Sequence, residues 1–133
     1  MRYLLIDNSN TRTKFMLGTE KELMPWIAYI NTAEIDFEII AETVQNQHWD
    51  AVCLCSVVPE KAIVIESSLT QISNKPFQKL TYQSELGMGI NYPSPEQIGA
   101  DRLANGIAAN ALYPSPCIII DFGTAVTLSL IHI

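Results

Sequence analysis

Two short apolar runs in this chain each end in an aspartate that is followed by small polar residues. The first run, Leu4-Leu-Ile-Asp7, leads into Asn8-Ser-Asn-Thr11, and the second, Ile118-Ile-Ile-Asp121, leads into Phe122-Gly-Thr124. Such a run closed by turn-forming residues predicts a strand, so the chain is constrained to form a sheet with carboxylates at strand ends. Backbone N–H groups in these turns can cradle phosphate oxygens, and the aspartate can hold a cation beside them. Two ordinary hairpin turns are the alternative, because Asp and Asn adopt turn conformations without a ligand.

The hydrophobic pattern along the rest of the chain predicts a mixed α/β layered fold. Strands are expected at residues 2–6, 11–17, 22–30, 51–58, 77–82, 117–120 and 125–133, and helices at 33–47, 59–72 and 94–112. The continuous apolar runs at 51–58 and 117–120 are typical of buried strands, the first of them buried on both faces. Thr32 is the expected N-cap of the first helix. Ser94, Pro95 and Gln97 form a capping box that predicts the start of the third.

Composition and charge exclude several classes of protein. The chain has 133 residues, of which 48% are hydrophobic and 17% charged, so it can build one ordinary folded domain. A net charge of −6 argues against a nucleic-acid surface, which needs clustered cations. No apolar run approaches the ~20 residues of a membrane span, and the first residues do not resemble a signal peptide. We therefore expect a cytoplasmic protein that binds neither membrane nor nucleic acid.

The three cysteines, Cys53, Cys55 and Cys117, form neither a disulfide framework nor a metal-binding pattern. Their count is odd, and neither histidine lies at ligand spacing from them. Because Cys53 and Cys55 lie two positions apart in an apolar strand, they share one face of it. The sequence predicts that they are buried as small hydrophobic residues.

A third candidate element is Gly99-Ala-Asp-Arg102, in the first turns of the predicted third helix. A carboxylate near a helix N-terminus is favoured by the helix dipole, and a stabilising surface charge is the commoner role. Alternatively, Asp101 accepts a proton from a substrate hydroxyl and Arg102 holds a substrate carboxylate in its fork. The small residues that follow allow this helix to pack closely against another element.

Taken together and in this order, Asp7-Asn-Ser-Asn-Thr11, Gly99-Ala-Asp-Arg102 and Asp121-Phe-Gly-Thr-Ala-Val-Thr127 resemble the motifs of the type III pantothenate kinases. The resemblance covers essentially the whole chain. It implies an α/β fold of the acetate and sugar kinase/actin superfamily, which is a ribonuclease H-like or actin-like ATPase lobe with a mixed sheet and flanking helices. It also implies ATP-dependent phosphorylation of pantothenate to 4'-phosphopantothenate, the first step of coenzyme A biosynthesis. The choice of pantothenate rests on the resemblance alone.

The resemblance further implies roles for individual residues. Asp101 matches the catalytic general base. ATP and phosphate binding is implied for Asp7, Asn8, Ser9, Asn10, Thr11, Arg12, Thr13, Lys14 and Thr124, and pantothenate binding for Tyr92, Gly99, Ala100, Asp101 and Arg102. Asp121 matches a ligand of a monovalent cation, K⁺ or NH₄⁺. Asp7 matches a residue beside Mg²⁺ or another divalent cation, which it contacts directly or through water. The family is dimeric, so a homodimer is implied.

This chain departs from the family pattern at three positions and in length. Ser9 stands where the family commonly has Gly, Asn8 where it has an aliphatic residue, and Ser129 where it usually has Asp. The second half of such an enzyme is absent. Residues 1–133 are therefore expected to form the N-terminal lobe of a two-lobed kinase that lacks its C-terminal lobe, and the truncated chain is expected to be inactive.

Two alternative functions are open at this stage. One is a non-catalytic relative that acts as a regulatory or transcriptional accessory protein. The other is a different superfamily member, such as a sugar kinase or a polyphosphate hydrolase. The intact Gly99-Ala-Asp-Arg102 motif beside both acidic turns argues against each of them.

Overall fold

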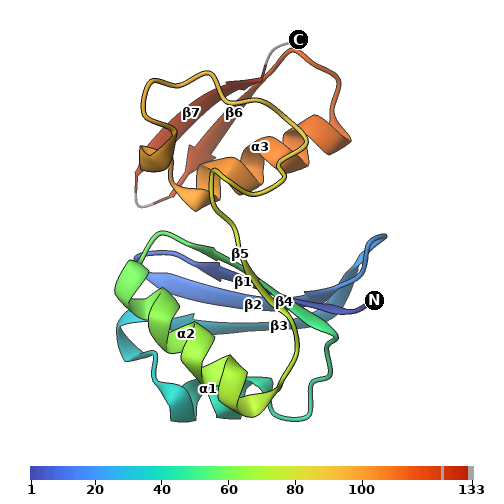
Figure 1. The fold of residues 1–133 in the computed structure, drawn as a ribbon, viewed down its shortest axis with the longest axis vertical. Coiled ribbons are helices and arrows are strands. Elements are labelled where there is room, and N and C mark those ends of the chain that lie inside the picture. The colour runs from blue at the N-terminus through green and yellow to red at the C-terminus, as the bar shows by residue number, and fades with distance from the viewer. Residues whose placement is uncertain (124, 132–133) are drawn as a thin grey trace. The chain divides into compact units, whose positions relative to one another are not determined.

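The computed structural model describes residues 1–123 and 125–131, and the chain divides into two compact units, Met1–Lys79 and Leu80–Ile133. The first unit contains β1 (Tyr3–Asn8), β2 (Arg12–Gly18), β3 (Leu23–Asn31), a 3₁₀ turn (Thr32–Glu34), α1 (Phe37–Val44), β4 (Ala51–Ser56), α2 (Pro59–Ile72) and β5 (Phe77–Lys79). The second contains a 3₁₀ turn (Pro95–Gln97), α3 (Ala100–Leu112), β6 (Cys117–Phe122) and β7 (Val126–Ile131) (Figure 1). The predicted α/β fold with a mixed sheet and helices is confirmed.

The sheet of the first unit has the strand order β3-β2-β1-β4-β5. Strand β1 pairs antiparallel with β2 and parallel with β4, and β5 extends the parallel side. Asp7 of β1 therefore lies between Lys14 of β2 and Cys55 of β4. The carboxyl ends of the parallel strands β1 and β4 lie at one edge of the sheet, where open α/β sheets bind ligands.

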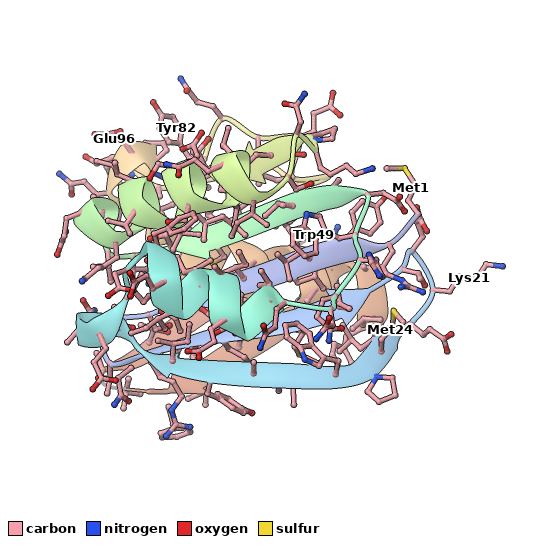
Figure 2. All side chains as sticks on the ribbon, turned by 90° about the horizontal axis from the view of Figure 1, so that it is seen from below. Met1, Lys21, Met24, Trp49, Tyr82 and Glu96 are labelled. Carbon is pink, nitrogen blue, oxygen red and sulfur yellow. The ribbon has the colours of Figure 1, made fainter. Side chains whose placement is uncertain are left out.

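Helices α1 and α2 pack against the same face of this sheet (Figure 2). Alternate residues of the strands point toward them and form a buried core with the apolar sides of both helices: Leu4, Ile6, Phe15, Leu17, Val52, Leu54, Ile40, Ile65 and Leu69. Strand side chains alternate between the two faces, so the neighbours of these residues point to the other side. Cys53 and Cys55 are there, and both are only half-buried. The prediction that residues 51–58 are buried on both faces was therefore wrong, because both helices cover one face.

The cysteines are free thiols, and all three are half-buried rather than fully buried. Burial raises the pKa of the Cys53 thiol above its ordinary value. The absence of a disulfide among these residues is as predicted, whereas their expected full burial was wrong.

Two helices begin later than the sequence predicts. Thr32 lies in a 3₁₀ turn, and Asp36 caps α1 instead, with its Oδ1 accepting a hydrogen bond from the Ile39 N–H at 2.8 Å. Ser94 makes no capping bond and precedes another 3₁₀ turn. The backbone is extended at Gly99 (φ −60°, ψ 141°), which becomes the N-cap of α3. Because α3 begins at Ala100, Asp101 lies in its first turn, where the helix dipole favours a carboxylate.

In the second unit, α3 packs against the two-stranded antiparallel sheet of β6 and β7. Gly106 of α3 allows the side chain of Met88 to pack closely against the helix, because a Cβ added at Gly106 would lie 2.7 Å from the Met88 Cε. Strands β6 and β7, which pair antiparallel, lie where the sequence predicts the last two strands. The predicted burial of residues 117–120 was wrong, because Ile118 and Ile120 are exposed. Side chains alternate along β6, and α3 covers only the other face of the hairpin.

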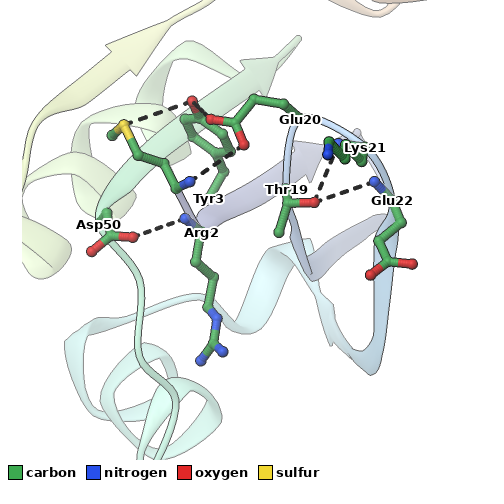
Figure 3. Close-up of polar contacts among 8 residues, drawn as sticks. Arg2, Tyr3, Thr19, Glu20, Lys21, Glu22 and Asp50 are labelled. Carbon is green, nitrogen blue, oxygen red and sulfur yellow. Dashed lines mark hydrogen bonds and ion pairs between the residues drawn. The ribbon is translucent and has the colours of Figure 1, made fainter.

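A polar cluster closes the opposite end of β1 from Asp7 (Figure 3). The Tyr3 hydroxyl donates to Glu20 Oε1 at 2.8 Å, and the terminal ammonium of Met1 lies 3.3 Å from Glu20 Oε2. The hydrogen bond from Tyr3 lowers the pKa of Glu20 and raises that of Tyr3. A cavity of about 660 Å³ lined by Arg2, Thr19 and Asp50, among others, opens at this end. The cavity therefore lies at the opposite end of β1 from Asp7.

No helix within residues 1–123 and 125–131 is long and apolar enough to cross a membrane.

Replacing Asp36 by alanine should lower the free energy of unfolding by about 1 kcal/mol, because the Ile39 N–H loses its acceptor. Ser94→Ala should change it by less than about 0.5 kcal/mol, since the Ser94 side chain caps no helix. Urea unfolding followed by circular dichroism measures both. A larger loss of stability for Ser94→Ala than for Asp36→Ala would instead support the N-cap that the sequence predicts at Ser94.

Candidate functional site

The turn between β1 and β2 presents the first group of predicted site residues. Asp7, at the end of β1, is exposed, and its Oδ1 accepts a hydrogen bond from the Ser9 hydroxyl at 3.1 Å. The Ser9 N–H donates to the Arg12 carbonyl at 3.2 Å and closes the turn. Asn10 and Thr11 at its tip are exposed. The turn therefore directs a carboxylate, an amide and a hydroxyl away from the core.

Asn8 and Thr13 belong to the same segment, but their side chains are turned inward. They are 1% and 0% exposed, and the Asn8 Nδ2 donates to the Thr13 Oγ1 at 2.8 Å. Asn8 Oδ1 accepts a hydrogen bond from the Ser56 hydroxyl at 2.6 Å. These two side chains therefore contact the interior of the unit and support the turn from behind.

Two cationic side chains lie next to this turn, on β2. The Arg12 Cζ is 5.3 Å and the Lys14 Nζ 5.8 Å from the centre of the Tyr29 ring on β3. Cation–π contact holds both charges over one ring. Lys14 is also the cross-strand neighbour of Asp7. Positive charge is thus concentrated beside the exposed end of the turn, although the chain as a whole is acidic.

The second group of predicted residues lies on α3 and on the strands that it contacts. Asp101 is half-buried, and its Oδ1 accepts a hydrogen bond from the Arg102 N–H at 2.9 Å. The Arg102 guanidinium reaches β7, where it donates to the Ser129 Oγ at 3.2 Å and to the Leu128 carbonyl at 2.9 Å. Arg102 is therefore held by the strand that follows the second acidic turn.

Asp121, at the second acidic turn, is held by Asn105 of α3. The Asn105 Nδ2 donates to the Asp121 Oδ2 at 2.8 Å, which fixes the carboxylate. Asn105 was not among the predicted site residues. Its position one helical turn after Asp101, in a helix of mostly small residues, is a signal that could have identified it.

The remaining predicted residues differ in exposure. Tyr92 is 47% exposed, Ala100 is buried, and Gly99 is the N-cap of α3. Thr124 lies outside the described residues. The structure thus presents the candidate residues as two groups, one on the β1–β2 turn and one on α3 with β6 and β7.

Within the part of the chain that the structure describes, no group of three or more His, Cys, Asp or Glu side chains could hold a metal ion. The first acidic turn offers carboxylate, hydroxyl and amide oxygens, and the second offers the carboxylate of Asp121; oxygens of these kinds are the ligands that Mg²⁺ and K⁺ prefer. A cation at Asp7 or Asp121 would complete its shell with water or with oxygens of a bound molecule. Mg²⁺ commonly binds in this way, through one or two carboxylates and substrate phosphates.

An antiparallel β1–β2–β3 meander that continues into parallel β4 and β5, with helices packed on the sheet, defines an α/β lobe of the actin-like ATPase type. The two acidic turns lie at the ends of β1 and β6 of this chain. The family model described as type III pantothenate kinase matches residues 3–132. The chain belongs to the type III pantothenate kinase family.

Several curated relatives, each named type III pantothenate kinase, match nearly the whole chain. The relative from Akkermansia muciniphila is 47% identical over 131 residues, which are 98% of this chain and 52% of that protein. The relative from Methylacidiphilum infernorum is 42% identical over 96% of this chain and 45% of its own length. The relative from Thermosipho melanesiensis is 35% identical over 96% of this chain and 53% of its own length. The chain thus spans about half the length of the curated relatives it matches.

Substituting Ser129 by aspartate, the residue usual in the family at this position, should stabilise the second unit. The introduced carboxylate would replace the Ser129 hydroxyl as the acceptor for Arg102 Nε and Nη2. Because both groups are partly buried, the gain in the free energy of unfolding should be about 1 kcal/mol at pH 7.

The pH dependence of this gain is part of the prediction. Pairing with Arg102 lowers the pKa of the introduced carboxyl in the folded state. The gain is therefore present above the ordinary pKa of aspartate and is lost as the pH falls through the lowered value. Urea unfolding at pH 7 and at pH 3 measures it, with Arg102→Met as the control background. An equal gain in that background would show that the carboxylate acts elsewhere.

Proposed function

We propose that the full-length protein containing this chain transfers the γ-phosphoryl group of ATP to the primary hydroxyl of pantothenate. The product is 4'-phosphopantothenate, the first intermediate of coenzyme A biosynthesis. The observation that carries this proposal is the family match over residues 3–132. The exposed Asp7 turn and the placement of Asp101 at the start of a helix support it, because phosphoryl transfer requires positioning, charge neutralisation and a proton acceptor.

We further propose that residues 1–133 are the N-terminal lobe of a two-lobed kinase. The chain spans about half of its relatives, which supports this division. The outer face of the β6–β7 hairpin supports it as well, because three cross-strand pairs of large apolar residues are exposed there: Ile118 with Leu130, Ile120 with Leu128, and Phe122 with Val126. An apolar face of this extent is covered in a stable protein, and the C-terminal lobe is the proposed cover. Alone, the truncated chain would be inactive.

In this proposal the β1–β2 turn binds the phosphates of ATP. Asn10 and Thr11 face the phosphate oxygens with their side chains, as does Ser9, whose N–H already donates to the Arg12 carbonyl, and Asn10 adds its backbone N–H. Asn8 and Thr13 are assigned to the ATP site by their motif. Arg12 and Lys14 add positive charge. Mg²⁺ or another divalent cation would bind near Asp7 and neutralise charge on the phosphates. Thr124 is assigned to the ATP site by its motif alone.

The α3 group binds and activates pantothenate in this proposal. Asp101 accepts the proton of the attacking hydroxyl, while its fixed position in the first turn of α3 keeps it aimed at one place. Arg102 binds the pantothenate carboxylate, with Tyr92, Gly99 and Ala100 completing the pocket. Asp121, oriented by Asn105, is the proposed ligand of K⁺ or NH₄⁺.

The assembly and location of the protein complete the proposal. We propose a homodimeric cytoplasmic enzyme that binds neither nucleic acid nor membrane. The net charge of −6 supports the exclusion of nucleic acid, because a nucleic-acid surface needs clustered cations.

The full-length protein should release ADP from ATP only when pantothenate is present, in a buffer that contains Mg²⁺ and K⁺. A coupled assay measures ADP, and mass spectrometry of the product identifies the added phosphoryl group. Reactions without pantothenate, or with glucose in its place, are the controls. No pantothenate-dependent release would favour a non-catalytic relative, and release with glucose would favour a sugar kinase.

Asp101→Asn should lower kcat by about 10²- to 10⁴-fold, because the amide cannot accept the hydroxyl proton. The fold should be preserved, since the remaining side-chain oxygen can still accept the hydrogen bond from the Arg102 N–H. Steady-state kinetics and thermal unfolding measure the two effects. Glu96→Gln, at an exposed carboxyl in the preceding 3₁₀ turn, is the matched control and should leave kcat unchanged. A kcat for Asp101→Asn equal to that of the control would remove Asp101 from the role of base.

A further inference from the structure

Four polar side chains from four different elements meet behind the β1–β2 turn. They are Asn8 of β1, Thr13 of β2, Thr32 of the 3₁₀ turn after β3, and Ser56 at the end of β4. The first three are at most 2% exposed. Hydrogen bonds of 2.6 to 2.9 Å join Ser56 to Asn8, Asn8 to Thr13, and Thr13 to Thr32. A continuous chain of hydrogen-bonded polar side chains thus supports the turn from the inside of the unit.

The direction of this chain follows from the number of protons. Thr32 Oγ1 lies 2.6 Å from the Ser9 carbonyl oxygen, which can only accept, so the single hydroxyl proton of Thr32 is used there. The 2.9 Å contact between Thr13 and Thr32 must then use the proton of Thr13. Thr13 in turn accepts from the Asn8 Nδ2.

The orientation of the Asn8 amide is fixed by the same count. If the amide oxygen of Asn8 faced Thr13, the single hydroxyl proton of Thr13 would have to be donated both to Asn8 and to Thr32, which is impossible. With its oxygen toward Ser56, Asn8 accepts the single Ser56 proton at 2.6 Å, a shorter contact than the 3.2 Å from the same hydroxyl to the Val58 carbonyl, and Ser56 accepts from the Val58 N–H at 3.1 Å. Val58 is the N-cap of α2, so the hydrogen bonds run one way from the start of α2 to the Ser9 carbonyl.

Thr32 is the member that contacts the turn itself, and it does so at two points. Its hydroxyl binds the Ser9 carbonyl, and its backbone N–H donates to the Thr11 carbonyl at 3.0 Å. In a trans peptide the C=O and the next N–H point in opposite directions. The Asn10 N–H therefore points away from Thr32, out of the core.

We propose that Thr32 is a positioning residue for the phosphate-binding turn, and that Asn8, Thr13 and Ser56 orient it through this one-way chain. The part of the proposal that concerns phosphate rests on the proposed function, whereas the clamp on the turn does not. Thr32 lies outside the motifs that carry the family resemblance. Asn8 stands where the family commonly has an aliphatic residue, and a buried amide there requires the partners that Thr13 and Ser56 supply.

The test is Thr32→Val in the full-length protein, which keeps the shape of the side chain and removes its hydroxyl. The KM for ATP should rise about three- to tenfold, the range expected for one net hydrogen bond, while the KM for pantothenate stays within about twofold. Thr32→Ser retains the hydroxyl and should restore the KM for ATP. Thr43→Val is the matched control, because it removes a 2.6 Å bond from a hydroxyl to the Ile39 carbonyl within α1.

Amide hydrogen exchange provides a readout that does not depend on activity. The N–H groups of Ser9 and Thr32, which bind the carbonyls of Arg12 and Thr11, should exchange faster in Thr32→Val than in wild type or in Thr43→Val. Unchanged exchange would overturn the clamp, whether or not the protein is a kinase. Faster exchange with an unchanged KM for ATP in an active enzyme would overturn the positioning role. If the wild type lacks kinase activity, the proposed function fails and exchange alone decides on the clamp.

Discussion

The pairing register of β1 is the constraint on which the first unit depends. This strand is bonded on both edges, to β2 in the antiparallel sense and to β4 in the parallel sense. Because side chains alternate along a strand, the register that buries Leu4 and Ile6 also buries Asn8 and exposes Asp7. A slip by one residue would bury the carboxylate and expose the core. Burial of the apolar residues on one face of β1 therefore also fixes the side of the sheet on which the Asp7 carboxylate lies.

The same strand pairing explains why the turn needs polar support from behind. The apolar core ends at Ile6, one alternation before the end of β1, and Asn8 occupies the next inward position. An amide is acceptable there only because hydroxyl groups of neighbouring elements satisfy it. In the second unit the polar contacts are arranged differently. Arg102 and Asn105 of α3 reach outward to β7 and β6, and they tie the helix to the second acidic turn.

Much of the architecture was predictable from local pattern. The strand-to-aspartate turns, the antiparallel meander and the start of α2 at Pro59 all follow from apolar periodicity and from the fixed φ of proline. The starts of α1 and α3 were not predictable. Thr32 and Ser94 fit the sequence pattern of an N-cap, but each is followed or occupied by a 3₁₀ turn. The α-helices begin a few residues later, with Asp36 and Gly99 as their N-caps. Which face of β4 is covered was also unpredictable, since a run of apolar residues does not reveal on which side the helices pack.

Candidate site residues could be identified from the sequence only where they belong to contiguous motifs. Asp7, Asp101 and Asp121 are apparent in the sequence because each belongs to a short pattern with a known chemistry. Thr32 is not, because its significance arises from a partner 23 residues away in the sequence, Ser9. A lone threonine after a strand has no local signal that distinguishes it from a cap.

The one-way chain of hydroxyl groups also has a consequence for how this protein can change. Each of the three hydroxyl protons in the chain is used once, so removing one member leaves a buried donor or acceptor without its partner. The effect of a substitution at one of these positions therefore depends on the residues at the others. An aliphatic residue in place of Asn8 would be tolerated best if Thr13 and Ser56 changed with it. The effects of substitutions at these four positions, which span 49 residues of sequence from Asn8 to Ser56, are therefore coupled to one another.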